Sequence, residues 1–486
     1  MRGQPRVLFV TPEAFPLIKS GGLGDVSGAL PPALRSLGAD VRILLPGYPE
    51  VLEGARLRRV GKTYRFFPSQ DPVQLLRGRM PDGETPLFVV DCPALFRRPG
   101  TPYQDAQGRD WVDNVWRFAA LAHTALLLST GKGPLRWIPD IVHCNDWPCG
   151  LTPAYMAHAG SQARSLMSVH NLAFPGSFPE EFVSAVGLPP SSYQLEGVEF
   201  YQTFSFLKAG LHYADAINTV SPSYAREIQT PEFGCGFDGL LTARRNTLSG
   251  ILNGIDMALW DPATDPHLDN NYDVDTLKNK QSNTRALRRR LGLPTSARAP
   301  LLGMVSRLTQ QKGADLLPAL MQELIDTSAQ LIVLGTGERG IEEKLKTLQD
   351  AIPDRVRVII GYDESLAHQI EAGADLFLMP SRFEPCGLSQ MYSMRYGTPP
   401  VVRATGGLAD SVVDAGKLTL RNASATGFCF GETTVKSFEG GVRRGMTARQ
   451  DKKTWQQIQR SGMQLDFSWE SSASTYMDLY RQILSD

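Results

Sequence analysis

The sequence predicts an α/β protein of two domains, each built on a parallel sheet that helices cover. The chain has 486 residues, more than one typical core holds, which favours two or three domains. Short apolar runs alternate with segments of helical periodicity, as parallel strands joined by helices do. Two similar glycine-rich loops, at 20–25 and 405–410, each stand between an apolar run and a helical pattern. We therefore expect each half to present a strand, a loop and a helix to a shared cleft.

Composition excludes several classes of partner. Lysine plus arginine and aspartate plus glutamate both number 50, so net charge draws the molecule neither to nucleic acid nor to an anionic membrane. The apolar run at 7–10 is too short for a signal peptide, and the longest apolar tract, 118–128, is shorter than the roughly 20 residues of a membrane span. We expect a cytoplasmic protein that acts on a neutral polymer or a small metabolite.

The first domain is expected to open with a strand at 6–11 and a glycine-rich loop that leads into a helix ending near Gly38. Gly21, Gly22 and Gly24 do not form the dinucleotide fingerprint, and the loop lacks the lysine of a P-loop. The glycines either serve a tight turn or let helix amides hold an anion, and Lys19 beside them favours the anion. Further strands are expected at 41–45, 87–91, 141–144, 166–170 and 216–220, with helices at 114–128 and 205–213. A long irregular loop at 97–114 is expected to be functional or mobile.

A change of pattern near 249–256, followed by a polar stretch, marks the expected domain boundary. The expected divisions are an N-terminal domain at 1–249, a C-terminal domain at 250–465 and a final segment at 466–486. The regular pattern of apolar residues weakens after Phe430. Apolar residues at helical spacing return at 470–484, which predicts an amphipathic helix. Strands of the second domain are expected at 301–305, 331–334, 356–360, 376–379 and 401–402.

The stretch 380–390 is where the chemistry is expected, because it follows an apolar strand and leads into a helix predicted to start near Gly387. In an open α/β sheet, ligands lie outside the carboxyl ends of the strands, so Glu384 is expected in a crevice beside the helix amides. A carboxylate next to an anion site suits a sugar nucleotide. The structural alternative is that Glu384 caps the helix.

The cysteines favour packing over chemistry. Six are scattered along the chain, and the close pair Cys144 and Cys149 lacks the short spacing of zinc and redox motifs, so we expect reduced, mostly buried thiols. Cys386 lies two residues after Glu384 and could be a nucleophile, but no motif supplies the base that a catalytic thiol needs. A packing or sugar-contact role for Cys386 is the preferred interpretation.

Five stretches that span nearly the whole chain carry one resemblance: KSGGLGDV at 19–26, HCNDW at 143–147, VHN at 169–171, SRLTQQKG at 306–313 and SRFEPCGL at 381–388, with NGID at 253–256. Together they resemble the bacterial glycogen synthases and plant starch synthases, glucosyltransferases with two Rossmann-like domains that face a central cleft (the GT-B fold). The family often has threonine or valine where this chain has Ser20, which is a small departure.

The resemblance implies a donor site that works without a metal cofactor. Arg307 and Lys312 are implied to bind the diphosphate, where cations replace a metal, and Glu384 is the essential carboxylate near the donor sugar. Simple surface cations at a helix start are the alternative for the first two. The family also implies that the α-configuration of the transferred glucose is retained. A second carboxylate for a double displacement is not evident, so retention is better explained by attack of the acceptor on the face from which the leaving group departs.

The remaining assignments follow from the same resemblance. His170, otherwise a structural histidine, is grouped with the catalytic residues Glu384, Lys312 and Arg307. Tyr362 is expected to stack on the nucleobase, implied to be adenine, although stacking accepts any base. Tyr103, alternatively a surface anchor, is expected to line the acceptor side with Asp146 and Trp147. The nucleotide-sugar site is expected to comprise Lys19, Gly22, Asp25, Asn171, Arg307, Lys312, Tyr362, Cys386, Gly387, Leu388, Ser389 and Gly407.

The implied function is transfer of glucose from ADP-glucose to the 4-hydroxyl at a nonreducing end of an α-1,4-glucan, with domain closure assembling the site. The resemblance also implies that the C-terminal helix at 466–486 packs back on the N-terminal domain. The expected partners are ADP-glucose and glycogen or a maltooligosaccharide. Three rival functions remain: a transferase of the same fold that uses UDP-glucose or a small acceptor, a noncatalytic glucan-binding protein, and a dehydrogenase. The missing dinucleotide fingerprint disfavours the last, and the four charged residues Lys19, Arg307, Lys312 and Glu384 disfavour the second.

Overall fold

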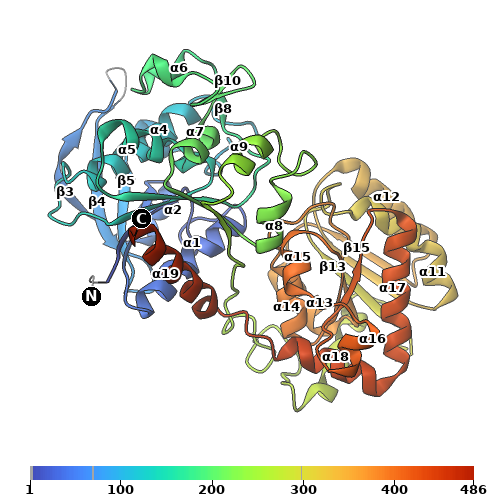
Figure 1. Ribbon diagram of the computed structural model, residues 1–486. Helices are drawn as coiled ribbons and strands as arrows, with labels where there is room; N and C mark the ends of the chain where they lie inside the picture. The colour runs from blue at the N-terminus through green and yellow to red at the C-terminus, as the bar shows by residue number, and fades with distance from the viewer. Residues whose placement is uncertain (1–3, 68–70, 297, 486) are drawn as a thin grey trace. The chain divides into compact units, whose positions relative to one another are not determined.

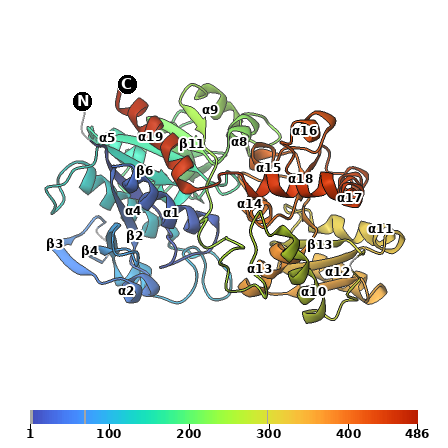
Figure 2. The same cartoon turned by 90° about the horizontal axis from the view of Figure 1, so that it is seen from below.

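The computed structural model describes residues 4–67, 71–296 and 298–485. Their contacts divide the chain into two compact units. The N-terminal unit runs as far as Gly254 and resumes at Trp469, and the C-terminal unit spans Ile255–Ser468. Both divisions lie a few residues beyond the expected 249 and 465. The first does so because strand β12 (Leu248–Gly250) still pairs with the N-terminal sheet. Figures 1 and 2 show the two units in two orientations.

The described residues of the N-terminal unit form a nine-stranded sheet in the order β12-β11-β7-β6-β1-β2-β5-β4-β3. The strands from β12 to β5 are parallel, and β4 and β3 extend the edge in antiparallel fashion. The remaining strands are β11 (Ala216–Thr219), β7 (Arg164–Val169), β6 (Ile141–Asn145), β1 (Arg6–Val10), β2 (Asp40–Pro46), β5 (Pro86–Asp91), β4 (Val73–Arg79) and β3 (Arg58–Tyr64), and a small separate sheet holds β8 (Ser177–Phe178), β10 (Thr203–Ser205) and β9 (Glu199–Phe200).

Helices cover both faces of the N-terminal sheet, with α4, α5 and α7 on one side and α1 and α19 on the other (Figure 1). Among the described residues, 97–113 contain neither helix nor strand, as expected for the long loop. The helices are α1 (Gly22–Ser36), α2 (Pro49–Gly54), α3 (Pro93–Phe96), α4 (Asn114–Ser129), α5 (Leu151–Ala159), α6 (Phe182–Ala185), α7 (Phe206–Tyr213), α8 (Pro222–Glu227), α9 (Asp238–Ala243) and α19 (Trp469–Ser485), with 3-10 turns η1 (Trp147–Cys149) and η2 (Pro190–Ser192).

The last helix, α19, belongs to the N-terminal unit and packs against α1. Its apolar face joins the core beneath β1, where Trp469 and Ile483 are buried among side chains from α1 and the sheet. Its tyrosines also reach polar groups: the Tyr480 hydroxyl lies 2.8 Å from Nδ1 of His143, and the Tyr476 hydroxyl donates to Asn218 Oδ1 at 2.9 Å. Burial lowers the pKa of His143 to about 3, so the ring is neutral and fixed by its hydrogen bonds.

The C-terminal unit contains a six-stranded, fully parallel sheet in the order β15-β14-β13-β16-β17-β18. Every strand expected in this half is present. The strands are β13 (Leu301–Val305), β14 (Gln330–Gly335), β15 (Val356–Ile360), β16 (Leu376–Met379), β17 (Pro400–Arg403) and β18 (Phe428–Phe430). The helices are α10 (Lys280–Arg290), α11 (Met321–Asp326), α12 (Arg339–Ala351), α13 (Glu364–Gly373), α14 (Ser389–Arg395), α15 (Gly406–Ser411), α16 (Lys417–Arg421), α17 (Val435–Gln450) and α18 (Lys452–Met463), with 3-10 turns η3 (Leu277–Asn279) and η4 (Ala314–Leu320).

The expected loss of regularity after Phe430 is wrong, because α17 and α18 fill most of this region. Glycines within α17 explain why the helical pattern was not recognised in the sequence. A Cβ atom on Gly445 would lie 2.7 Å from the Leu376 side chain, and one on Gly441 would lie 3.1 Å from Val401. These glycines let the helix approach the sheet closely, and they remove the apolar side chains from which helical periodicity is recognised.

Strand order reverses once in each sheet. In the N-terminal unit β2 lies on one side of β1 and β6 on the other, and in the C-terminal unit β14 lies on one side of β13 and β16 on the other. Ligands of open α/β sheets bind outside the carboxyl ends of the strands at such reversal points. The loops after β1 and β6, and those after β13 and β16, are therefore the positions to examine for function.

No helix among the described residues is both long enough and apolar enough to cross a bilayer.

Candidate functional site

The reversal point of the C-terminal unit holds an ion pair. Lys312 lies in the loop after β13, Glu384 lies in the loop after β16, and Nζ of the lysine is 2.5 Å from Oε2 of the glutamate. The two side chains are 18% and 7% exposed. Ser381 Oγ also donates to Glu384 Oε2 at 3.1 Å. Helix α14 has Leu388 at its N-cap and no side-chain cap, so the alternative that Glu384 caps this helix is wrong.

The second glycine loop supports the segment that carries Glu384. The Gly407 amide donates to the carbonyl oxygens of Glu384 and Pro385, both at 3.1 Å. A Cβ atom on Gly407 would lie 2.1 Å from the Cys386 carbonyl oxygen, and one on Gly406 would lie 2.0 Å from that of Glu384. The Gly407 amide is therefore bonded within the chain, and glycine is required at 407 because two backbone segments meet there. A contact between Gly407 and the nucleotide sugar stays a prediction.

The other residues of this loop occupy varied positions. Cys386 is a buried thiol outside any disulfide, 5% exposed, which favours the packing interpretation. Gly387 has a left-handed backbone with φ of 72°, and Leu388 and Ser389 are half-buried. The helix expected near Gly387 begins at Ser389 and has seven residues, because the left-handed Gly387 cannot belong to its first turn.

Arg307 and Tyr362 stand on the same edge of the sheet. Arg307 is exposed after β13, and its guanidinium donates to Gln311 Oε1 at 3.3 Å. Tyr362 follows β15, is 79% exposed, and donates its hydroxyl proton to the carboxylate of Glu364. Arg382 differs from Arg307, because both of its terminal nitrogens bind Asp315, at 2.7 and 2.8 Å. Of these two arginines, Arg382 forms a bidentate pair with a carboxylate and Arg307 does not.

In the N-terminal unit the first glycine loop follows β1. Lys19 is exposed and its Nζ lies 2.7 Å from Oδ1 of Asp25. Helix α1 begins at Gly22, with Gly21 as its N-cap and no side-chain cap. A Cβ atom on Gly21 or Gly22 would meet nothing within 4 Å. Packing inside the chain therefore does not require glycine at these two positions.

The loop after β6 presents Asp146 with a positive backbone φ of 58°. Its Oδ1 accepts the amides of His170 and Asn171, at 2.8 and 3.4 Å. Loss of hydration raises the pKa of this half-buried carboxyl to about 7, against the opposing effect of the two amides. Asp146 thereby joins the end of β6 to the end of β7, where His170 lies.

His170 is held by a residue that the sequence did not single out. Its Nε2 lies 3.1 Å from Oδ1 of Asn145, whose Nδ2 donates to the Val10 carbonyl oxygen at 3.0 Å. Burial lowers the pKa of His170 to about 4, so the ring is neutral near pH 7. The Asn171 side chain accepts the Ala173 amide at 3.1 Å. The position of Asn145, buried at the end of β6 and directly before Asp146, is the signal that could have identified it.

Tyr103 is half-buried rather than a surface anchor, so that alternative is wrong. Its ring lies 6.2 Å from both Phe118 and Trp147. Its hydroxyl donates to Oε1 of Glu13 at 3.0 Å. Glu13 was also missed from the sequence, because a lone carboxylate in a loop matches no motif, although its place just after β1 is at the reversal point of the sheet.

Comparison with known proteins identifies the family. The starch synthase catalytic domain model matches residues 6–243, and the glycosyl transferases group 1 model matches residues 288–461. Over 483 residues the chain is 52% identical to a glycogen synthase of Nitrosomonas eutropha, covering 99% of this chain and 96% of the relative. The chain belongs to the glycogen and starch synthase family. The resemblance found in the sequence is therefore confirmed.

Solved structures confirm the fold class of this glycogen and starch synthase family member. The catalytic domain of starch synthase IV from Arabidopsis thaliana, bound to ADP and acarbose, has a TM-score of 0.87 and 32% identity, with both chains fully covered. A sucrose-phosphate synthase from Thermosynechococcus elongatus shares the fold at a TM-score of 0.59 and 17% identity, covering 99% of this chain and 100% of its own. The chain has the two Rossmann-like domains of the GT-B glycosyltransferases.

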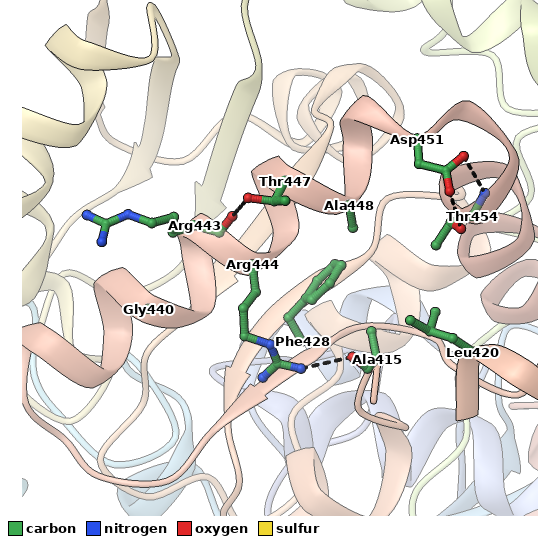
Figure 3. Close-up of a pocket in the computed structure, with 10 residues that line it drawn as sticks. All are labelled: Ala415, Leu420, Phe428, Gly440, Arg443, Arg444, Thr447, Ala448, Asp451 and Thr454. Carbon is green, nitrogen blue, oxygen red and sulfur yellow. Dashed lines mark hydrogen bonds between the residues drawn. The ribbon is translucent and has the colours of Figure 1, made fainter. Parts of the chain in front are cut away.

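Two further observations concern metal binding and a surface hollow in this family member. Across residues 4–67, 71–296 and 298–485, no group of three or more histidine, cysteine, aspartate or glutamate side chains is placed to hold a metal ion. A hollow of about 560 Å³ lies in the C-terminal unit, and no expected site residue lines it. Figure 3 shows the side chains around it. Its arginines are engaged, Arg444 with Asp414 and Arg443 with Glu323. The hollow is lined by Ala415, Leu420, Phe428, Gly440, Arg443, Arg444, Thr447, Ala448, Asp451 and Thr454.

Proposed function

We propose that this chain is a glycogen (starch) synthase that transfers glucose from ADP-glucose to the 4-hydroxyl at a nonreducing end of an α-1,4-glucan, with retention of configuration and release of ADP. The observation that carries the proposal is the Lys312–Glu384 pair at the strand-order reversal of the C-terminal unit. The 52% identity to a glycogen synthase and the ADP and acarbose bound to the Arabidopsis relative support it.

The donor diphosphate needs positive charge as it leaves. Lys312 and Arg307 share one loop, and the proposal gives both cations to the diphosphate, Lys312 as a point charge and Arg307 as a planar fork. Glu384 holds the Lys312 ammonium in place and faces the donor sugar. Because these cations stabilise the leaving charge, the proposed reaction needs no metal cofactor.

In the proposed transfer, the bond between the anomeric carbon and the β-phosphate oxygen breaks, and a bond from the acceptor 4-oxygen to the anomeric carbon forms on the same face. The 4-hydroxyl proton passes to the departing phosphate oxygen, which balances the step. The neutral His170 ring and Asn171 are assigned to the donor sugar, and Lys19 and Asp25 to the donor side of the first glycine loop. Tyr103, Asp146 and Trp147 are assigned to the acceptor glucan, whose rings stack on aromatic faces.

Nucleotide release tests the proposal. Wild-type protein is incubated with glycogen or maltooligosaccharide, a chelator, and either ADP-glucose or UDP-glucose, and the free nucleoside diphosphate is measured. We expect ADP release that depends on glucan and is lost in Glu384→Gln. Glu323→Gln is the matched control, because Glu323 is also a buried carboxylate paired with a cation of this unit. Release from UDP-glucose alone, or no release from either donor, contradicts the proposal, and dependence on added metal contradicts its metal-free form.

We also propose that the protein works in the cytoplasm without a nucleic acid or membrane partner, as its equal numbers of acidic and basic residues favour. Cell fractionation checks the location.

A further inference from the structure

Glu13 is a buried carboxylate that touches two separate segments of the N-terminal unit. It is 2% exposed. Its Oε2 accepts the Ser20 amide at 2.5 Å and the Ser20 hydroxyl at 2.9 Å. Its other oxygen, Oε1, accepts the Tyr103 hydroxyl at 3.0 Å. One oxygen therefore binds the first glycine loop, and the other binds the long loop at 97–113.

The two segments have different tasks in the function proposed above. Ser20 follows Lys19 and precedes Gly21, the N-cap of α1, so its position fixes the part of the loop assigned to the donor. Tyr103 is assigned to the acceptor and lies beside Trp147. We infer that Glu13 is a positioning residue that couples the donor-side loop to the acceptor-side tyrosine, so that the order of one segment depends on that of the other. This inference rests on the proposed function.

The chemistry of a carboxylate makes this coupling specific. Two equivalent acceptor oxygens can serve donors from two directions at once, which an amide cannot do, because one of its ends is a donor. Burial raises the pKa of Glu13, and the hydrogen bonds from Ser20, Tyr103 and the Gly21 amide oppose that rise. Buried hydrogen bonds to a charged group are among the strongest in proteins. Loss of either side should therefore release the segment that it holds.

Glu13→Gln is the sharpest variant, since it keeps the shape and replaces one accepting oxygen with a donor. We expect KM for ADP-glucose and KM for glucan to rise together, each by about tenfold, which corresponds to the loss of about 1.4 kcal/mol in binding. Asp215→Asn is the matched control: Asp215 accepts the Ser165 amide and hydroxyl at 2.7 and 2.8 Å, the same pair of bonds away from the loops. Equal kinetics for Glu13→Gln and Asp215→Asn would overturn the inference.

A double-mutant cycle between Ser20→Ala and Tyr103→Phe tests the coupling even when Glu13→Gln does not fold. Each removes one donor to Glu13 and leaves the carboxylate in place. We expect Ser20→Ala to raise KM for glucan as well as for ADP-glucose, and the combined variant to lose less than the product of the single losses. Independent effects, with Ser20→Ala confined to the donor KM and Tyr103→Phe to the acceptor KM, would overturn the inference. Absence of wild-type ADP release would instead defeat the proposed function.

Discussion

The glycine loops at 20–25 and 405–410 have similar sequences and each opens a helix, yet their surroundings are opposite. At Gly21 and Gly22 an added Cβ atom meets nothing within 4 Å, whereas at Gly406 and Gly407 it would lie 2.0 and 2.1 Å from backbone carbonyl oxygens. In the second loop glycine is needed because the Glu384 segment presses against it. The same motif thus provides an open surface in one unit and an internal support in the other.

The carboxylates at the two strand-order reversal points also differ, in the groups that bind them. In the C-terminal unit a buried carboxylate, Glu384, has a cation as its partner. In the N-terminal unit the carboxyls of Glu13 and Asp146 are held by amides and hydroxyls, and the pKa of each is raised. Under the proposed function the first arrangement fixes a charge for the chemistry, whereas the second connects loops. The predictions below test this contrast from the largest expected effect to the smallest.

Lys312→Ala should have the largest effect. It leaves Glu384 buried without its cation, which typically costs about 3–5 kcal/mol, and it removes a charge assigned to the leaving diphosphate, which should lower kcat by about 10²–10³-fold. Urea unfolding and steady-state ADP release check the two parts. Lys19→Ala is the control, because the exposed Lys19–Asp25 pair should leave the urea midpoint almost unchanged. Similar unfolding midpoints for the two variants would remove the distinction between the two ion pairs.

Gly407→Ala should come next. The new methyl group cannot fit 2.1 Å from the Cys386 carbonyl oxygen, so the Glu384 segment must shift. Overpacking of this kind costs about 1–3 kcal/mol. We expect a lower melting temperature together with a fall in kcat, since the displaced segment carries Glu384. A variant with wild-type melting temperature and kcat would show that the support is not needed.

Asp146→Asn should change how stability depends on pH. The folded-state pKa of Asp146, about 7, lies above its ordinary value of 3.8, so the folded protein holds a proton that the unfolded chain releases. The stability from this group is fully present below pH 3.8 and is lost as pH rises to about 7, by up to ~1.4 kcal/mol per pH unit. Relative to Asp146→Asn, the wild type should become less stable between pH 4 and 7. Urea midpoints for both proteins across this range check it, and a constant difference contradicts a raised pKa.

Gly22→Ala should have the smallest effect on folding. Its Cβ atom meets nothing within 4 Å, and the position is the first residue of a helix, so alanine should leave stability unchanged or raise it by about 0.4–1 kcal/mol. Because the methyl group would stand over the open loop, KM for ADP-glucose should rise. Thermal unfolding and donor kinetics check the two parts. A loss of stability comparable to that of Gly407→Ala would mean that packing requires glycine in both loops.

The sequence predicted the strands of both sheets well and the loop contacts poorly, for physical reasons. Buried runs such as 301–305 and 376–379 carry their own signal, because parallel strands covered on both faces are continuously apolar. Helix α17 was missed because glycines occupy its sheet-facing positions. The roles of Glu13, Asn145 and Gly407 depend on partners between 7 and 135 residues away or on a close backbone approach, and a single sequence shows neither.

The most direct test of the proposed function follows the transferred sugar itself. Wild-type protein is supplied with ADP-glucose labelled at the anomeric carbon and a maltooligosaccharide, and the product is analysed by NMR. We predict that the label appears in an α-1,4 linkage at the nonreducing end, with one ADP released per glucose added, and that Glu384→Gln gives neither. Free glucose without chain extension, a β-linked product, or label transferred equally well by Glu384→Gln would contradict the account.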